Sequence, residues 1–144
     1  MKLLASCGLI AASFTLLLAG PATAGKKWEK FPSCKSEKVL KKLVKRFNKT
    51  EKTYWEKRGL VLSGIRQPHQ HSVNPFPDSP INRRYCHGDA QFENGRTRRV
   101  HYLIEEGAGF AGFGWNVEYC IHGLDPWRYY DGACRVLSLS LIHI

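Results

Sequence analysis

The sequence predicts an α+β domain in which one N-terminal amphipathic helix packs on a four-stranded antiparallel sheet. Three observations lead to this fold class. Apolar residues recur at helical spacing before residue 50, apolar and polar residues alternate in later segments, and an Asn-Gly dipeptide separates two of those segments. A period of 3.6 indicates a helix and a period of two indicates strands, so the pattern corresponds to a helix layer on a sheet.

The first 24 residues are predicted to be a cleaved secretory signal peptide. Lys2 precedes an apolar stretch, residues 3–20, and Ala22-Thr23-Ala24 gives the small-x-small pattern that signal peptidase recognises. A retained membrane anchor is the alternative. However, Pro21 follows the apolar stretch directly, and the stretch is only about long enough to span a bilayer. We therefore expect a mature chain that begins at Gly25 and is not an integral membrane protein.

The predicted mature chain is one basic domain, residues 25–136. Its excess charge lies at its start, because residues 25–58 hold eleven Lys and two Arg against four Glu, a sum of +9. Residues 59–144 hold eight Arg and eight acidic residues, which cancel. Residues 137–144 are interpreted as a non-native or disordered tail, because the part from Leu139 onward resembles translated adapter sequence.

The predicted helix starts after Ser33 or Ser36, either of which can cap it. It either breaks near Asn48 and restarts, or runs to Lys57 before Gly59 ends it. Its apolar stripe consists of Val39, Leu40, Leu43, Val44 and Phe47. The remaining surface of the helix is basic and carries Lys38, Lys41, Lys42, Lys45, Arg46 and Lys49.

The sheet follows the helix. Residues 60–65 form the first predicted strand, and residues 68–80 form a loop with four of the chain's seven prolines. Residues 113–121 form the fourth strand, with Trp115 and Val117 on one face and Cys120 on the other.

The second and third strands, residues 85–92 and 97–105, form a hairpin around Asn94-Gly95. This dipeptide suits a two-residue type I′ turn. Such a turn fixes the cross-strand pairs as Glu93 with Arg96, Ala90 with Arg99, His87 with Tyr102, and Cys86 with Leu103.

Four cysteines follow the signal peptide, and an even number in an exported chain indicates two disulfides. No two have C-x-x-C spacing, so we expect no metal site and no cofactor. In a simple meander, Cys86 and Cys120 lie on strands about 10 Å apart, which is beyond the reach of a disulfide. Our first choice is Cys34 with Cys86 and Cys120 with Cys134. The alternative is Cys34 with Cys120 and Cys86 with Cys134.

Three stretches of the sequence resemble a family of small exported alphaproteobacterial proteins. The first runs from Arg46-Phe47-Asn48 to Trp55, and the second from Ser79-Pro80-Ile81 to Tyr85-Cys86. The third joins Tyr102-Leu103-Ile104-Glu105 to Gly112-x-Gly114-Trp115-Asn116-Val117-Glu118, Cys120 and Gly123-Leu124-Asp125. The family is uncharacterised, so the resemblance implies a bacterial periplasmic setting and supplies no activity. The predicted arrangement is also similar to cystatin-like or nuclear-transport-factor-like folds, a likeness that carries no function.

His87 and Asp89 are the best candidates for acid–base catalysis, with Tyr102 as a hydrogen-bond donor on the same strand face. The predicted register places His101 on the opposite face. His69 and His71 fall in the proline-rich loop without a third ligand nearby, which is weak support for a metal site.

Two loops carry other candidate sites. Trp127 and Arg128 lie among tyrosines in a segment that either stacks a sugar or base, or clamps over the sheet edge. Gly107-x-Gly109-x-x-Gly112 matches the dinucleotide fingerprint by letter, but a strand follows where that motif needs a helix. We therefore expect a flexible loop in which Phe110 and Phe113 form an apolar lip.

The charge partition favours a non-enzymatic, periplasmic or secreted binding domain. Its lysine face is suited to anionic lipid, lipopolysaccharide or an envelope protein. Nucleic acid is not expected, because no basic sheet with interleaved aromatics is present in the sequence. One alternative is a small enzyme with its pocket between His87, Asp89, Tyr102 and the Phe110–Phe113 loop. Another is an inhibitor of an exported protein that uses residues 68–80 and the Trp127 loop.

Overall fold

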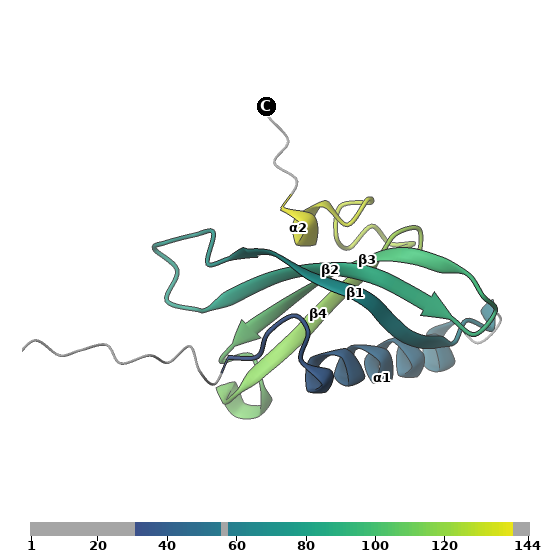
Figure 1. The fold of residues 1–144 in the computed structure, drawn as a ribbon, viewed down its shortest axis with the longest axis horizontal. Helices are drawn as coiled ribbons and strands as arrows, with labels where there is room; N and C mark the ends of the chain where they lie inside the picture. The colour runs from purple at the N-terminus through teal and green to yellow at the C-terminus, as the bar shows by residue number, and fades with distance from the viewer. Residues whose placement is uncertain (1–30, 56–57, 140–144) are drawn as a thin grey trace, which may run out of the picture.

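The computed structural model describes residues 31–55 and 58–139 (Figure 1). The elements in chain order are α1 (Glu37–Tyr54), β1 (Leu62–Val73), β2 (Arg83–Phe92), β3 (Thr97–Glu106), the 3-10 turn η3 (Phe110–Gly112), β4 (Trp115–Ile121) and α2 (Arg135–Ser138). The strands form one antiparallel sheet in the order β1-β2-β3-β4. Helix α1 lies on one side of this sheet and α2 on the other (Figure 1). The predicted α+β class is confirmed, whereas the predicted signal peptide and Gly25 lie outside the described residues.

Helix α1 is continuous over 18 residues, and the break considered near Asn48 is not present. The Asn48 side chain is instead bound to the start of β1: its Nδ2 donates to the Leu62 carbonyl at 3.0 Å, and the Leu62 N–H donates to its Oδ1 at 2.8 Å. Because both polar groups of the amide are bonded to β1, Asn48 ties the helix to the strand that follows it. Ser36 is the N-terminal cap residue.

The main core lies between α1 and the sheet. Val39, Leu43 and Phe47 are 0–4% exposed and contact apolar residues that alternate along the strands. From the sheet these are Leu62, Cys86, Ala90, Phe92, Val100, Tyr102, Ile104, Val117 and Ile121. Burial of one such aliphatic or aromatic side chain contributes about 1.5–3 kcal/mol, so the stripe read from the sequence is the main attachment of the helix.

Strand β1 is longer than predicted and includes residues that the sequence placed in the proline-rich loop. Pairing with β2 is interrupted between Arg66 and His69, where Gln67 takes a φ of 46° and Pro68 lies in the irregularity. Proline is tolerated there because β1 is an edge strand and a bulge requires no N–H from that residue. The predicted loop boundary was therefore wrong, and His69 and His71 lie on a strand.

The β2–β3 hairpin has a register one residue away from the predicted one. The Phe92 N–H donates to the Arg96 carbonyl at 2.9 Å, which leaves three residues in the turn, and Gly95 has a φ of 78°. A type I′ turn needs positive φ at both central residues, whereas a three-residue turn needs one residue in the left-handed region. The cross-strand pairs are consequently His87 with His101, Cys86 with Tyr102, and Ala90 with Arg98. All three correct the predicted pairs.

Two disulfides join the layers, with the first-choice pairing. Cys34–Cys86 connects the segment before α1 to β2 with Cα atoms 5.8 Å apart, and Cys120–Cys134 connects β4 to the turn before α2 at 5.6 Å. Disulfides persist in oxidising compartments, so the bonds indicate a location outside the cytoplasm. None of the described helices is long and apolar enough to cross a membrane.

A smaller core lies on the other face of the sheet, under α2. It consists of Tyr85, Leu103, Cys120, Cys134 and Leu137. Leu137 is 2% exposed, whereas the predicted non-native or disordered tail begins at this residue. The packed domain therefore extends past residue 136, because the Cys120–Cys134 bond holds α2 against the sheet. Residues 140–144 lie outside the described part of the chain.

Candidate functional site

The outer side of α1 carries a line of five exposed lysines spaced three or four residues apart. We call it the lysine stripe, and it consists of Lys38, Lys41, Lys45, Lys49 and Lys52. At 3.6 residues per turn these side chains project opposite the buried stripe. Lys41 forms an ion pair with Glu37 at 2.6 Å, which lowers the pKa of that carboxyl. The other four have no ion-pair partner among the described residues.

Two of the predicted binding residues hold the helix to the sheet. The Lys42 ammonium donates to the Trp115 carbonyl at 3.2 Å and lies 4.8 Å from the centre of that indole ring. Arg46 donates to the Val117 carbonyl and to Asn116 Oδ1. Burial, followed by the charge of Arg46, lowers the pKa of Lys42. Lys42 and Arg46 therefore belong to the α1–β4 contact, whereas Lys52 extends the exposed line beyond Lys49.

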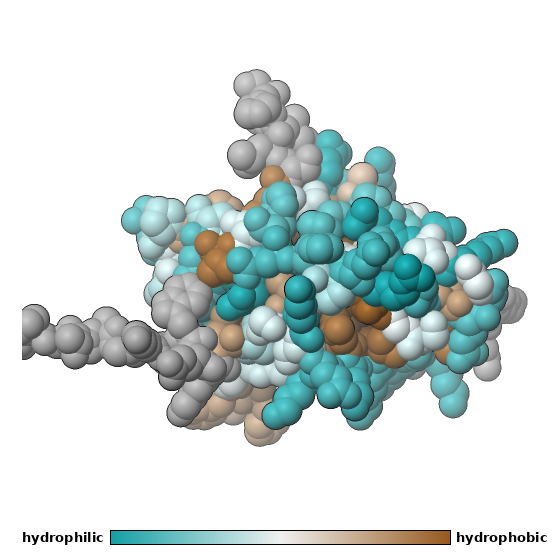
Figure 2. Space-filling view, viewed as in Figure 1, coloured by the Kyte–Doolittle hydropathy of each residue, from teal (hydrophilic) through white to brown (hydrophobic). Residues whose placement is uncertain are grey.

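A shallow apolar groove runs beside the lysine stripe. It has a volume of about 290 Å³ and lies between α1 and the β1 edge. Leu40, Val44 and Ile65 supply its apolar wall, with Lys41 and Lys45 at its side. Figure 2 shows hydrophobic surface between α1 and β1 surrounded by hydrophilic side chains. Basic and apolar surface thus lie next to each other on this side of the molecule.

The Trp127 loop packs against the end of α1. The rings of Trp55 and Trp127 are 4.8 Å apart and border a cleft of about 190 Å³, which Tyr119 and Tyr130 also line. Trp127 is 73% exposed, and Arg128 is exposed beside it with a φ of 53°. Of the two predicted roles for this loop, the clamp over the edge of the sheet is observed, because the Cys120–Cys134 bond and the Tyr130–Glu118 contact hold the loop to the edge strand β4. Ligand stacking stays a prediction.

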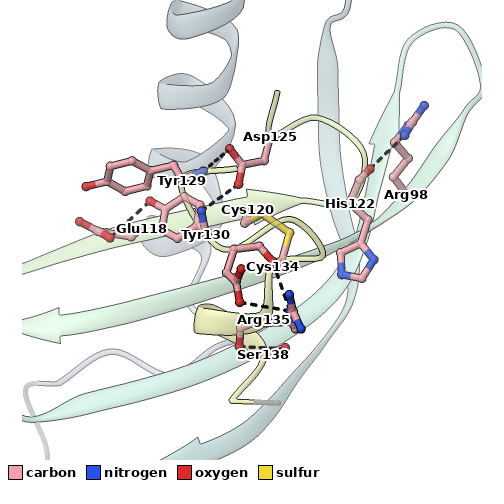
Figure 3. Close-up of a disulfide and its surroundings, with 11 residues drawn as sticks. Arg98, Glu118, Cys120, His122, Asp125, Tyr129, Tyr130, Cys134, Arg135 and Ser138 are labelled. Carbon is pink, nitrogen blue, oxygen red and sulfur yellow. Dashed lines mark hydrogen bonds and ion pairs between the residues drawn. A yellow bond between two sulfur atoms is a disulfide. The ribbon is translucent and has the colours of Figure 1, made fainter. Parts of the chain in front are cut away.

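Side-chain bonds fix the shape of this loop (Figure 3). The backbone N–H groups of Tyr129 and Tyr130 donate to the Asp125 carboxylate at 2.9 and 2.8 Å, and the Tyr130 hydroxyl lies 3.4 Å from Glu118. Burial, followed by the charge of Glu118, raises the pKa of Tyr130. The Cys120–Cys134 bond closes the loop.

The glycine-rich loop between β3 and β4 has no phosphate-binding geometry. It contains only the three-residue turn η3 before β4 begins, so no helix N-terminus follows its glycines. Phe110 is 97% exposed and Phe113 is 79% exposed. Both rings are exposed, whereas the apolar lip that they were expected to form stays a prediction. The loop joins β4 at Trp115, the residue that Lys42 contacts.

The sheet face opposite α1 carries five histidines in a row, a cluster that sequence reasoning missed. The histidine row consists of His69, His71, His87, His101 and His122. It crosses β1, β2 and β3 and ends in the turn after β4. Ring centroids are 5.6 Å apart for His69 and His87, 6.4 Å for His71 and His87, 6.2 Å for His87 and His101, and 5.1 Å for His101 and His122. The wrong loop boundary and the wrong hairpin register had separated these residues.

Burial and mutual repulsion weaken protonation in the middle of the row. The pKa of His87 is lowered by burial and then by Arg99 and the neighbouring histidines, against the opposing effect of Asp89. Burial, and then His122, lowers the pKa of His101 from 6.5 to about 4. Both rings are therefore neutral at neutral pH. The Nε2 atom of His122 is buried and has no hydrogen-bond partner within the described part of the chain, while Arg98 donates to its carbonyl at 3.0 Å (Figure 3).

The predicted catalytic trio is not assembled. His87 and Asp89 share a face, and Asp89 pairs with Arg99 at 3.4 Å. Tyr102 lies on the opposite, α1-facing side, where it is buried and its hydroxyl donates to the Cys34 carbonyl at 2.7 Å. Burial raises the pKa of Tyr102 well above its usual value. Its placement beside His87 was wrong, and the reason is the one-residue register difference.

Comparisons of the chain with protein families, with curated proteins and with solved structures found no match. The resemblance to exported alphaproteobacterial proteins and the likeness to cystatin-like folds therefore stay predictions. The candidate sites rest on the geometry of this chain alone.

Proposed function

We propose that this protein is an exported, non-enzymatic binding domain whose lysine stripe docks on an anionic, phosphate-bearing surface of the cell envelope. The observation that carries the proposal is the alignment of five exposed lysines on the outer side of α1. The two disulfides support an extracytoplasmic location. Signal-peptide cleavage before Gly25 and a periplasmic or secreted destination are parts of the same proposal.

The dimensions and charge of the stripe suit a flat anionic surface. Lys38 and Lys52 are fourteen residues apart, which corresponds to about 21 Å along a helix. Each lysine near an anionic membrane contributes about 1 kcal/mol of attraction within a Debye length of about 8 Å at physiological salt. Five side chains on one line can all reach such a surface together, so their contributions act in one binding event.

Apolar features beside the stripe favour lipid over a purely ionic partner. The groove formed by Leu40, Val44 and Ile65 borders the lysines. Phe110 and Phe113 have exposed rings and lie in the loop that leads into β4. This strand begins at Trp115, which contacts Lys42 on α1. Aromatic residues beside basic residues stabilise proteins at the level of lipid headgroups.

The test measures binding of the purified, tag-free, oxidised protein to vesicles with and without phosphatidylglycerol, and to lipopolysaccharide in a separate arm. We expect retention on phosphatidylglycerol vesicles, weaker retention on phosphatidylcholine, and a steep loss with added salt. The lipopolysaccharide arm identifies which phosphate-bearing surface binds more tightly. Equal binding to neutral and anionic vesicles, or indifference to salt, would count against the proposal.

A matched pair of variants separates the stripe from net charge. K45Q/K49Q removes two stripe charges that have no ion-pair partner among the described residues, and R66Q/R96Q removes two exposed charges from β1 and the hairpin turn. At about 1 kcal/mol per lysine, the first variant should lose at least tenfold in affinity. The second should stay near wild type. Equal losses of affinity in the two variants would show that binding depends on the total charge of the protein and not on the lysine stripe.

A further inference from the structure

The histidine row brings three imidazoles on two neighbouring strands close to one another. The pairing of β1 with β2 is irregular at His71, but the rings of His69 and His71 both lie beside that of His87, so both project from the same side of the sheet. His87 is the direct cross-strand partner of His69 on β2. The ring of His87 is 5.6 Å from that of His69 and 6.4 Å from that of His71.

These separations can be compared with zinc coordination. A zinc–nitrogen bond is about 2.0–2.1 Å and the ring centre lies about 1.1 Å beyond the nitrogen, so two imidazoles on one tetrahedral zinc have centroids roughly 5 Å apart. The separation of 5.6 Å between His69 and His87 is close to this value. The 6.4 Å between His71 and His87 is longer, so the exposed His71 side chain has to rotate toward the ion. A set of three histidines with an open fourth position is an established donor set for zinc.

We propose that His69, His71 and His87 form a binding site for a borderline divalent transition-metal ion of the Zn²⁺ class, with solvent in the remaining positions. Imidazole nitrogen favours zinc, copper and nickel over the hard cations magnesium and calcium. This site is separate from the lysine stripe, which lies on the other side of the sheet, and it does not depend on the proposed docking function.

Binding requires rotation of side chains without movement of the strands. Among the described residues, no three potential ligands are already arranged to hold a metal ion. His69 and His71 are exposed on an edge strand, and exposed side chains change rotamer within nanoseconds. The backbone therefore fixes the positions from which the three imidazoles start, and the two exposed rings close on the ion.

Charged side chains beside the proposed site affect its affinity for a cation. Arg66 and Arg99 lie beside the row and oppose a cation. The Asp89 carboxylate, two residues from His87 on the same face, offsets them and is paired with Arg99 at 3.4 Å. The site is consequently suited to an ion that binds through nitrogen ligands, because the nearby carboxylate is already engaged.

Isothermal titration of Zn²⁺ into the tag-free, disulfide-bonded protein tests the proposal, with Mg²⁺ as the hard-cation control. We expect one equivalent of Zn²⁺ to bind and Mg²⁺ not to compete. Loss of an outer-shell partner already weakens a metal site about 10–100-fold, so H69Q and H87Q should each weaken Zn²⁺ affinity by at least tenfold. Far-ultraviolet circular dichroism and thermal melting in EDTA should be unchanged for H69Q, because that side chain is exposed.

Two matched variants locate the site. H122Q removes a member of the row that does not adjoin His69 or His71, and H143Q removes the histidine outside the described residues; both should keep Zn²⁺ affinity within twofold of wild type. The absence of Zn²⁺ binding, or an H87Q variant that binds as well as wild type, would overturn the proposal. A loss in H122Q as large as that in H87Q would also overturn it, because the ion would then lie at the His101–His122 end.

Discussion

The imidazole of His87 on β2 lies directly across from that of His101 on β3, with ring centroids 6.2 Å apart. This pairing exists because the hairpin turn contains three residues, from Glu93 to Gly95, so that Phe92 and Arg96 close it. A two-residue turn would have placed His87 opposite Tyr102. One residue in a turn therefore decides whether the sheet face opposite α1 presents a row of imidazoles.

The depressed pKa of His101 predicts that acid destabilises the protein. An unfolded chain protonates His101 around pH 6.5, whereas the folded ring resists protonation until about pH 4. Between these values the unfolded state binds more protons, so the free energy of unfolding falls as the pH falls from 6.5 to 4. The ring is partly exposed and solvent screens part of the effect, so we expect about 1–2 kcal/mol.

Urea denaturation of H101Q and wild type, in EDTA at several pH values between 4 and 7, measures this contribution. The H101Q curve should be flatter with respect to pH over that interval. H71Q, which removes an exposed histidine from the same row, serves as the control and should keep most of the wild-type slope. Identical slopes in H101Q and wild type would mean that His101 does not resist protonation.

Gly88 is predicted to be required by the bulge in β1. A Cβ at this position would lie 2.9 Å from the Arg66 carbonyl oxygen and 2.9 Å from Ile65 Cγ2, so backbone would have to move. We expect G88A to lower the free energy of unfolding by about 1–3 kcal/mol, the usual cost of overpacking.

The control for this substitution is G64A, since a Cβ at Gly64 meets nothing within 4 Å. An alanine there should be neutral, or stabilising by about 0.4–1 kcal/mol, because it restricts the unfolded chain. Chemical denaturation of the two variants should thus give shifts that differ in size and in direction. A neutral G88A would show that the bulge does not approach β2 as closely as the structure places it.

Tyr102 is predicted to be structural. Its hydroxyl satisfies the buried Cys34 carbonyl at 2.7 Å, next to the disulfide that joins Cys34 to Cys86. Y102F leaves that carbonyl without a partner and should cost about 1–3 kcal/mol in unfolding free energy. Y54F removes the hydroxyl of a tyrosine that is 69% exposed and should change little. A Y102F variant as stable as Y54F would contradict the buried bond.

Much of the fold is encoded in local periodicity, and so it can be read from the sequence. The stripe of Val39, Leu43 and Phe47 predicts both the helix and its buried side, because residues four positions apart lie on one side of a helix. The extent of β1 could not be read in the same way. Pro68 normally ends a strand, and only its place at the edge of the sheet, which is a tertiary fact, allows β1 to continue.

The predicted hairpin register was wrong, although the sequence contains the pattern that determines the register. Ala90 and Phe92 on β2, and Val100 and Tyr102 on β3, all face α1. Cross-strand partners share a face, so these even-numbered residues must pair with even-numbered residues. A two-residue turn pairs odd with even and would expose half of them. The apolar pattern of the two strands therefore outweighs the preference of Asn94-Gly95 for the shorter turn, and the histidine row follows from it.

The two disulfides are predicted to contribute unequally to the free energy of unfolding and to hold different parts of the molecule. Cys34–Cys86 spans 52 residues and Cys120–Cys134 spans 14. In the chain-entropy account, these loops correspond to about 4 and about 3 kcal/mol of stability. C34S/C86S should therefore lower the denaturation midpoint more than C120S/C134S, because the longer loop restricts the unfolded chain more strongly.

Removal of Cys120–Cys134 should cost less stability than removal of Cys34–Cys86, but it should have a local effect that the other change lacks. Cys134 holds the Trp127 loop, whose indole lies 4.8 Å from that of Trp55, whereas Cys34 lies at the opposite end of α1 from Trp55. Tryptophan fluorescence of folded C120S/C134S should shift to longer wavelength as the Trp55–Trp127 contact loosens, and that of folded C34S/C86S should not. Non-reducing peptide mapping of the wild type provides the reference. A Cys34–Cys120 peptide there would contradict the pairing, because Cys120 points away from the α1 face on which Cys34 is buried.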